Sequence, residues 1–285
     1  MSATAGIGRL YLVPTPIGDA TDLSPRAIAV LGAADVVAAE DTRVARALLH
    51  GAGISGRDIV RYDDHTELAQ APALVARMLA GSAVALVSDA GTPLCSDPGY
   101  RLVRAAIDAG VQVVPLPGPN AAVTALIASG LPSDRFLFLG FPPRQGGPRE
   151  SFLRAVAAEP ATLVLYEAPH RILDTLDAAR AALGDRPACL AISLTKEWER
   201  FHRGPLSAVR AGIDGEGEIL GEMTLVIGGC PEDERGDRER VEQLVRTLAA
   251  AGVSPAVIRD AVGEAFGWPK RELYQLALAS RPAGS

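Results

Sequence analysis

The sequence predicts an α/β fold with two α/β domains, the first on a parallel-rich sheet and the second on a mixed sheet, followed by a small C-terminal helical module. Short apolar runs alternate with amphipathic helical segments along the first part, which is typical of a parallel sheet covered on both faces. Short strand-like runs lie close together late in the second part, which favours a mixed sheet. The composition changes after Pro231, where a charged stretch leads into helical sequence. We therefore place the domains at 1–118, 119–230 and 231–285.

The first domain is expected to alternate strands and helices. Ser24 precedes Pro25 at the start of an apolar helical run, which is the usual order of an N-cap and a proline in the first turn. Glycines that follow later runs mark helix ends. The expected strands are 10–14, 35–40, 58–62, 82–89 and 111–118, and the expected helices are 24–34, 41–53, 67–81 and 100–110.

The second domain begins with a turn and helix over 115–132. Its expected strands lie near 135–140, 161–167, 188–195 and 221–229, and its expected helices are 148–158 and 170–183. In the C-terminal module, we expect 230–240 to be a charged linker that runs into a helix. Two further helices over 254–279 resemble a small helix-turn-helix, with Trp268 and Tyr274 as core anchors.

Composition limits the class of protein. Hydrophobic residues make up 48% of the 285 residues, which is enough for a buried core. No window of about 18 uncharged apolar residues exists, and the N-terminus lacks a signal-peptide pattern, so we expect a cytoplasmic protein without a membrane span. Three separated cysteines without a C-x-x-C pair fit a reducing compartment and no cysteine zinc site. The net charge of −6 argues against a protein that coats nucleic acid, but it allows a local basic patch.

Four loops rich in glycine and proline follow predicted strands. They span 14–24, 87–103, 115–122 and 166–172. Because ligands bind outside the carboxyl ends of strands in open α/β sheets, the four loops suggest one shared cleft, although each alone is compatible with a simple tight turn. The chain contains neither G-x-G-x-x-G nor a Walker lysine motif, which argues against a nucleoside triphosphate. Such loops can present backbone groups to a neutral or zwitterionic ligand.

No standard catalytic motif is present, since both G-x-S-x-G and H-E-x-x-H are absent. His65 lies in "YDDHTE" beside several carboxylates, where we favour a solvated loop over a metal site and leave a general-base role open. His170 and Arg171 follow a strand end and are candidates for substrate contact, although Arg171 could equally cap or pair locally. The segment 195–204 mixes cations with Trp198 and Phe201, which suits either RNA contacts or an exposed edge strand.

Five longer segments are distinctive together. They read "LYLVPTPIGD", "AAEDTR", "SDAGTPLCSDPGYRLVRAAIDAG", "PLPGPNAAVTALIASGLPSDRFLFLGF" and "LYEAPHRI". This combination resembles the small-subunit ribosomal RNA 2′-O-methyltransferase I family of the tetrapyrrole methylase superfamily. The resemblance runs from about residue 9 to the C-terminus, where "GWPKRELYQLAL" is similar to the family's terminal helical module. The chain departs from the family pattern at Trp198, where a carboxylate is common.

The resemblance implies two α/β domains of tetrapyrrole-methylase type with S-adenosylmethionine bound in the cleft between them. It implies methylation of the 2′-hydroxyl of a cytidine in the decoding region of 16S rRNA. It also implies a homodimer that acts on the assembled small ribosomal subunit. Two other readings stay open: a methyltransferase for a tetrapyrrole or another small molecule, and a non-catalytic cofactor- or ribosome-binding module.

Site residues follow from the matched motifs. By resemblance, the cofactor contacts are Ser88, Asp89, Ala90, Gly91, Thr92, Pro119, Asn120, Ala121, Tyr166, Glu167, Ala168, Leu194, Met223 and Thr224. Substrate or RNA contacts are expected at Pro16, Gly18, Arg43, Arg144, Arg171, Arg200 and Arg203. Because a ribose hydroxyl must lose its proton, we propose Lys196, Asp64 or His65 as the residue that assists it. No metal is expected.

Overall fold

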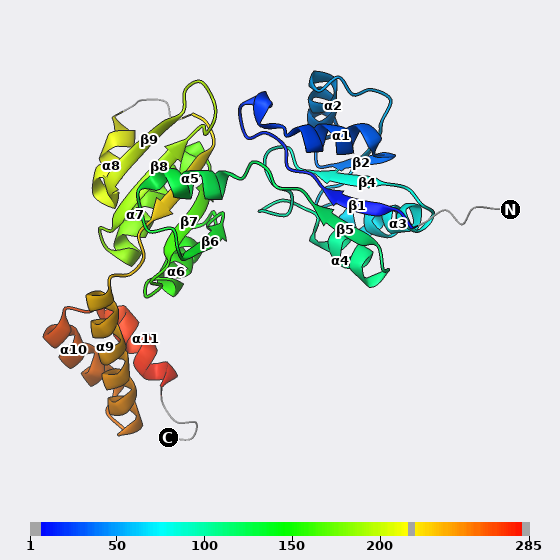
Figure 1. Cartoon of the computed structure of the whole chain (residues 1–285). Helices are drawn as coiled ribbons and strands as arrows, with labels where there is room; N and C mark the ends of the chain where they lie inside the picture. Colours follow the sequence, from blue (N-terminus) through cyan, green and yellow to red (C-terminus); the bar gives the residue numbers. More distant parts are fainter. Residues whose placement is uncertain (1–6, 216–219, 281–285) are drawn as a thin grey trace.

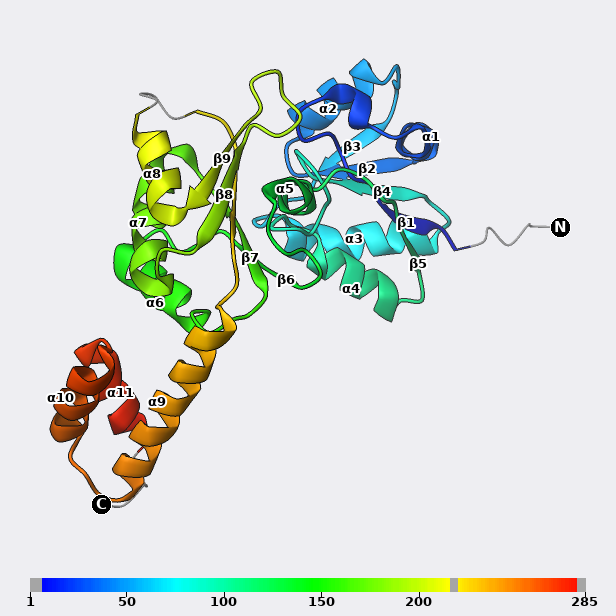
Figure 2. The same ribbon diagram turned by 60° about the vertical axis from the view of Figure 1, so that its left-hand side comes forward.

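The computed structural model describes residues 7–215 and 220–280, including their side chains except for those of 232–238. It contains two five-stranded sheets with their helices and a group of C-terminal helices (Figure 1). In both views the C-terminal helices lie beyond the second sheet, away from the first (Figure 2). The predicted fold class, with a parallel sheet, a mixed sheet and a helical module, is confirmed.

The first sheet is parallel throughout, in the order β3-β2-β4-β1-β5. Leu31 of α1 and Leu49 of α2 pack on one face, and Leu74 of α3 and Leu102 of α4 pack on the other. The sheet is therefore buried on both sides, as its apolar strands require. Its elements are β1 (Arg9–Leu12), α1 (Pro25–Ala33), β2 (Val36–Ala39), α2 (Thr42–Gly51), β3 (Asp58–Arg61), α3 (Glu67–Leu79), β4 (Val84–Val87), α4 (Tyr100–Asp108) and β5 (Gln112–Pro115).

The second sheet is mixed, in the order β6-β7-β10-β8-β9, with only β6 and β7 parallel. Helices α6, α7 and α8 contribute Leu153, Leu176 and Val209 to the core on one face. Helix α5 covers the other face through Ala125 and Leu126. The elements are α5 (Ala121–Ser129), β6 (Phe136–Gly140), α6 (Gly146–Ala155), β7 (Thr162–Glu167), α7 (Ile172–Leu183), β8 (Pro187–Ile192), β9 (Arg200–Pro205), α8 (Leu206–Asp214) and β10 (Met223–Ile227).

Strand β9 resolves one of the open alternatives for the segment 195–204. It pairs antiparallel with β8 and lies at the edge of the sheet. The edge-strand interpretation is thus confirmed for Arg200–Pro205. The helix α8 that follows had no sequence expectation, although Leu206, Val209 and Ile213 are buried at helical spacing.

The C-terminal helices α9 (Glu232–Ala250), α10 (Pro255–Phe266) and α11 (Lys270–Ala279) share a small core. The expected charged linker over 230–240 is wrong, since α9 already begins at Glu232. Trp268 packs against this core, but Tyr274 remains 37% exposed and the buried anchor is its neighbour Leu273. Among the described residues, no helix is both long and apolar enough to cross a membrane.

Candidate functional site

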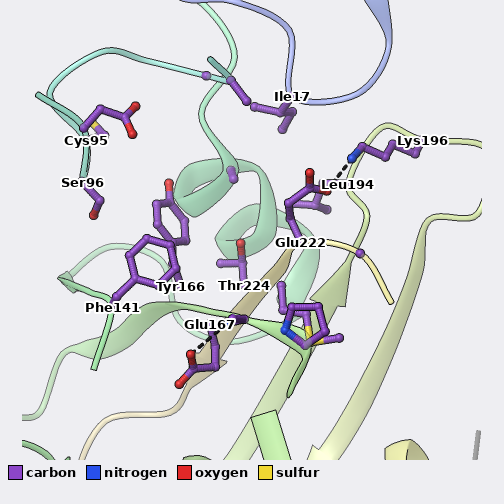
Figure 3. A pocket seen from close by; sticks show the side chains of 18 of the residues that line it. Ile17, Cys95, Ser96, Phe141, Tyr166, Glu167, Leu194, Lys196, Glu222 and Thr224 are labelled. Atoms are coloured by element: carbon purple, nitrogen blue, oxygen red, sulfur yellow. Dashed lines mark hydrogen bonds and ion pairs between the residues drawn. The ribbon is translucent and has the colours of Figure 1, made fainter. Parts of the chain in front are cut away.

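A cavity of about 670 Å³ lies where the strand-end loops of both sheets meet (Figure 3). The loops after β1, β4 and β5 supply one part of its wall, and the ends of β6, β7 and β8 with the start of β10 supply the other. This is the edge at which α/β sheets bind ligands. The lining residues are Ile17, Ala90, Gly91, Thr92, Cys95, Ser96, Asp97, Ala121, Phe141, Tyr166, Glu167, Ala168, Pro169, Leu194, Lys196, Trp198, Leu220, Gly221, Glu222, Met223 and Thr224.

The loops of the first domain are joined by backbone hydrogen bonds. Thr15 N–H donates to Gly91 O at 2.9 Å, and Gly91 N–H donates back to Thr15 O at 3.0 Å. The Thr92 hydroxyl donates to Pro119 O at 2.7 Å, which brings in the loop after β5. Gly91 adopts φ +85°, a conformation that favours glycine. All four predicted loops therefore contribute to one cleft.

The predicted cofactor contacts fall into two groups. Those that line the cavity are Ala90, Gly91, Thr92, Ala121, Tyr166, Glu167, Ala168, Leu194, Met223 and Thr224. The others, Ser88, Asp89, Pro119 and Asn120, are not among the lining residues. The Ser88 hydroxyl donates to Gly91 O at 3.1 Å. The side-chain Oδ1 of Asn120 accepts from Val123 N–H at 3.1 Å and so caps the N-terminus of α5. These contacts shape the loops.

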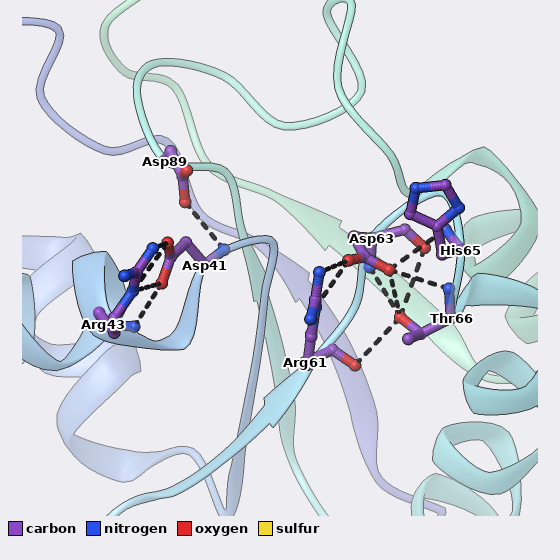
Figure 4. Close-up of polar contacts among 7 residues, drawn as sticks. All are labelled: Asp41, Arg43, Arg61, Asp63, His65, Thr66 and Asp89. Carbon is purple, nitrogen blue, oxygen red and sulfur yellow. Dashed lines mark hydrogen bonds and ion pairs between the residues drawn. The ribbon is translucent and has the colours of Figure 1, made fainter.

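Asp89 is oriented toward helix α2. Its Oδ1 accepts from the backbone N–H of Asp41 at 3.0 Å (Figure 4). Asp41 in turn caps α2 through Arg43 N–H and pairs with the Arg43 guanidinium at 2.5 Å. The Asp89 carboxylate thus joins the loop after β4 to the start of α2.

Tyr166 and Glu167, at the end of β7, line the cavity and are also hydrogen-bonded to other elements of the domain. The Tyr166 hydroxyl accepts from Ala122 N–H at 3.2 Å, and burial raises the pKa of Tyr166 to about 12. Glu167 is almost fully buried and accepts from the Thr175 hydroxyl at 2.5 Å. Arg171 Nε lies 3.2 Å from Glu167 Oε1, and its Nη2 donates to Pro142 O at 2.5 Å. With its side chain only 13% exposed, Arg171 is held inside the domain, which favours a structural role over RNA contact.

The three candidates for assisting the hydroxyl are not together. Lys196 lines the cavity and forms an ion pair with Glu222 (Figure 3). Asp64 and His65 are exposed in the loop after β3 and do not line it. In that loop the buried Asp63 accepts from Thr66 N–H at 2.9 Å and pairs with Arg61 at 2.5 Å (Figure 4).

The remaining RNA candidates lie on elements of both domains. Arg43 is paired with Asp41, and Arg144 is exposed after β6. On β9, the Arg203 guanidinium donates to Ala128 O at 2.7 Å and lies 4.5 Å from the centre of the Phe201 ring. Arg200 is half-buried on the same strand.

Pro16 and Gly18 lie in the loop after β1, next to the loop after β8. A Cβ atom at Gly18 would come within 2.5 Å of Thr195 Oγ1, so the two loops approach as closely as glycine allows. The same hydroxyl oxygen accepts from Asp19 N–H at 3.0 Å. Loops from the two domains are therefore in direct contact at this side of the cleft.

Glu40 and Asp97 have raised pKa values, and the sequence did not single out either residue. Burial, with repulsion from Asp89 and Asp97, raises the pKa of Glu40 to about 7. Burial, opposed by a hydrogen bond from Ser88 and reinforced by Asp89 and Asp64, raises the pKa of Asp97 to about 6. Asp97 also lines the cavity. The only sequence signal was position, because Glu40 directly follows β2 and Asp97 lies in the loop after β4.

The family model and the similar proteins both point to methylases. A family model described as Tetrapyrrole (Corrin/Porphyrin) Methylases matches residues 9–210. The protein named ribosomal RNA small subunit methyltransferase I from Micromonospora olivasterospora is 47% identical, covering 98% of this chain and 90% of that protein. The protein of the same name from Escherichia coli O157:H7 is 45% identical, covering 97% of each.

Solved structures share the fold. Uroporphyrin-III C-methyl transferase from Thermus thermophilus, complexed with S-adenosyl homocysteine, has a TM-score of 0.53 at 23% identity. The match covers 78% of this chain and 97% of that one. The common fold therefore extends over both sheets.

The raised pKa of Glu40 predicts a pH-dependent stability. The folded state keeps a proton on Glu40 up to a pKa of about 7, whereas the unfolded chain releases it near the ordinary glutamate pKa of 4.5. Between these values the folded state binds more protons, so this carboxyl reduces stability as the pH rises. Glu40→Gln should therefore raise the melting temperature more at about pH 8 than at about pH 5.

Calorimetric melting of both proteins at the two pH values tests this expectation. Glu264→Gln, at an exposed position on α10, serves as the matched control. Its effect on the melting temperature should not increase with pH. An effect of Glu40→Gln that is equal at both pH values would contradict the electrostatic interpretation.

Proposed function

This chain belongs to the tetrapyrrole methylase family, and within it to the group named ribosomal RNA small subunit methyltransferase I, and on that premise we propose its reaction. It transfers the methyl group of S-adenosylmethionine to the 2′-hydroxyl of a cytidine in the decoding region of 16S rRNA. The observation that carries the proposal is the 45% to 47% identity to these relatives over nearly the whole chain.

The cavity residues suit the proposed cofactor. A volume of about 670 Å³ is within the usual range for small-molecule sites. Ala90, Gly91 and Thr92 offer small side chains and backbone groups, which suit the amino-acid end and ribose of the cofactor. Apolar and aromatic residues at the ends of β7, β8 and β10 suit the adenine, and we propose Tyr166 and Leu194 among them. When bound, the cofactor supplies an electrophilic methyl group on a cationic sulfur.

The protein's part in the reaction is mainly positioning. Methyl transfer requires oxygen, carbon and sulfur in line, so a cleft that fixes both partners removes much of the entropic barrier. Of the three residues proposed to assist the hydroxyl, Lys196 has the support of lining the cavity. Its ammonium, held by Glu222, is suited to stabilise negative charge as it develops on the ribose oxygen. Asp64 and His65 remain candidates only if the RNA brings its hydroxyl to their loop.

The proposal includes the biological setting implied by the family resemblance. The substrate is the assembled small ribosomal subunit, the active form is a homodimer, and the compartment is the cytoplasm. Pro16 and Gly18, in the loop after β1, border the RNA in this proposal. Arg43, Arg144, Arg200 and Arg203 remain proposed phosphate contacts.

Loss of the gene tests the proposed reaction. Mass spectrometry of 16S rRNA from a deletion strain should show one missing ribose methyl on a cytidine, restored by the wild-type gene. The gene for Lys196→Met should restore it poorly, because removing one charge-stabilising group costs about 10²- to 10³-fold in rate. An unchanged methylation pattern in the deletion strain would favour a small-molecule substrate or a non-catalytic role.

The pKa of Asp97 predicts how cofactor affinity changes with pH. Its carboxyl, with a pKa raised to about 6, becomes negative as the pH rises through that value. S-adenosylmethionine carries a positive sulfur and S-adenosylhomocysteine a neutral one. Affinity for the first should therefore increase more than affinity for the second between about pH 5 and pH 8.

Isothermal titration calorimetry with both ligands measures this difference. Asp97→Asn should remove the difference in pH dependence while leaving both ligands able to bind. The same pH dependence for the two ligands in the wild-type protein would show that the carboxylate does not act on the sulfur charge.

A further inference from the structure

Trp198 is an exposed aromatic side chain at the boundary of two depressions. It lines the large cavity and also a neighbouring hollow of about 490 Å³ formed with Gly18, Asp19, Thr195, Lys196 and Glu197. The residue is 60% exposed, although burial of a tryptophan is strongly favourable. Its exposure at this one place is therefore a feature that packing does not explain.

A hydrogen bond to the buried Ser193 fixes the orientation of the Trp198 ring. Its Nε1 donates to Ser193 Oγ at 3.1 Å, and Ser193 is fully buried. The backbone N–H of Ser193 donates to Glu222 O at 2.9 Å, which anchors the serine to the residue before β10. The only polar group of the indole is thus satisfied within the protein, and the exposed part of the residue is left for contacts with another molecule.

The loop that carries Trp198 is held in an unusual conformation. Ser193 has φ 53° and Thr195 has φ 62°, values that residues with a Cβ rarely adopt. Such conformations persist only where surroundings fix them, and they cluster at functional sites. Here Thr195 N–H donates to Glu199 Oε2 at 2.8 Å, and Thr195 Oγ1 accepts from Asp19 N–H across the cleft. The loop is preorganised from both domains.

Two other aromatic side chains, Phe201 and Trp268, are already engaged in contacts within the protein. Phe201 is half-buried, packs against the α5 core and lies beneath the Arg203 guanidinium. Trp268 packs in the C-terminal core and donates to Glu272 Oε2 at 3.2 Å. Of the two aromatic residues in the segment 195–204, Trp198 alone is both exposed and at the cavity.

We propose that Trp198 is a stacking platform for a nucleobase of the substrate RNA, either the target cytosine or a base next to it. The inference rests on the proposed function, since a ribose that enters the cavity beside Lys196 must bring its base to the rim. Bases taken out of a helix are commonly received on aromatic rings, and stacking accepts any base face. The neighbouring Asp19 and Glu197 make this rim a poor phosphate site, so stacking suits it better than backbone contact.

Steady-state kinetics with unmethylated small subunits test the platform. Trp198→Ala should lower kcat/KM about 5- to 150-fold, the factor that loss of one stacked base gives. Trp198→Phe should retain most of the activity, because it keeps an aromatic face. Trp268→Phe, the matched control at the other of the two tryptophans, should behave as wild type. Affinity of all variants for S-adenosylmethionine should match that of the wild type.

Two results would overturn the platform while the proposed function stands. One is wild-type kcat/KM in Trp198→Ala. The other is a loss in that variant which appears wholly as weaker S-adenosylmethionine binding, since the ring would then cover the cofactor.

A fluorescence titration decides the question even if the wild-type enzyme fails to methylate the subunit. In Trp268→Phe, Trp198 is the only tryptophan, so its emission reports the site directly. Adding a single-stranded RNA with the decoding-region sequence should cause a saturable loss of this emission. No change in emission at RNA concentrations that saturate binding, measured separately by filter retention, would contradict the proposal.

Discussion

Two backbone hydrogen bonds between Thr15 and Gly91 are the constraint on which the cleft depends. They join the loops after β1 and β4, which are neighbours in the parallel sheet. The Thr92 hydroxyl then binds Pro119 O and extends the same surface to the loop after β5. A Cβ atom at position 91 would lie 3.2 Å from Ile17 Cγ2, so a small residue keeps the loops close. One wall of the cavity is therefore largely backbone, set by strand order.

The sequence predicted this wall well because its signals are local. Proline and glycine after an apolar strand predict a loop at the carboxyl edge of the sheet. Because β4, β1 and β5 are neighbours in the parallel sheet, their loops lie side by side. Direction of side chains was not predictable in the same way. Asp89 turns to the Asp41 N–H and Arg171 to the Pro142 carbonyl oxygen, because these partners lie 48 and 29 residues away along the chain. Strand β9 was left open because cations beside aromatic residues fit RNA contacts as well as an exposed edge strand.

The raised pKa values of Glu40 and Asp97 depend on neighbours that only the fold supplies. Asp89 and Asp97 in the loop after β4, and Asp64 in the loop after β3, approach Glu40 only after the sheet forms. A cleft with carboxylates suits a cationic cofactor, and it also restricts how an acidic chain can bind RNA. A stacking contact at Trp198 needs no phosphate and thus fits a protein with net charge −6. The basic residues on other elements would then position the RNA from a distance.

The proposed reaction is tested most directly with purified protein. Small subunits from the deletion strain are incubated with S-adenosylmethionine labelled in its methyl group, and the 16S rRNA is digested to nucleosides. The account predicts that the label appears in 2′-O-methylcytidine from one position of the decoding region. Label on a base, label on another ribose, or no transfer to RNA by a protein that binds the cofactor would contradict it.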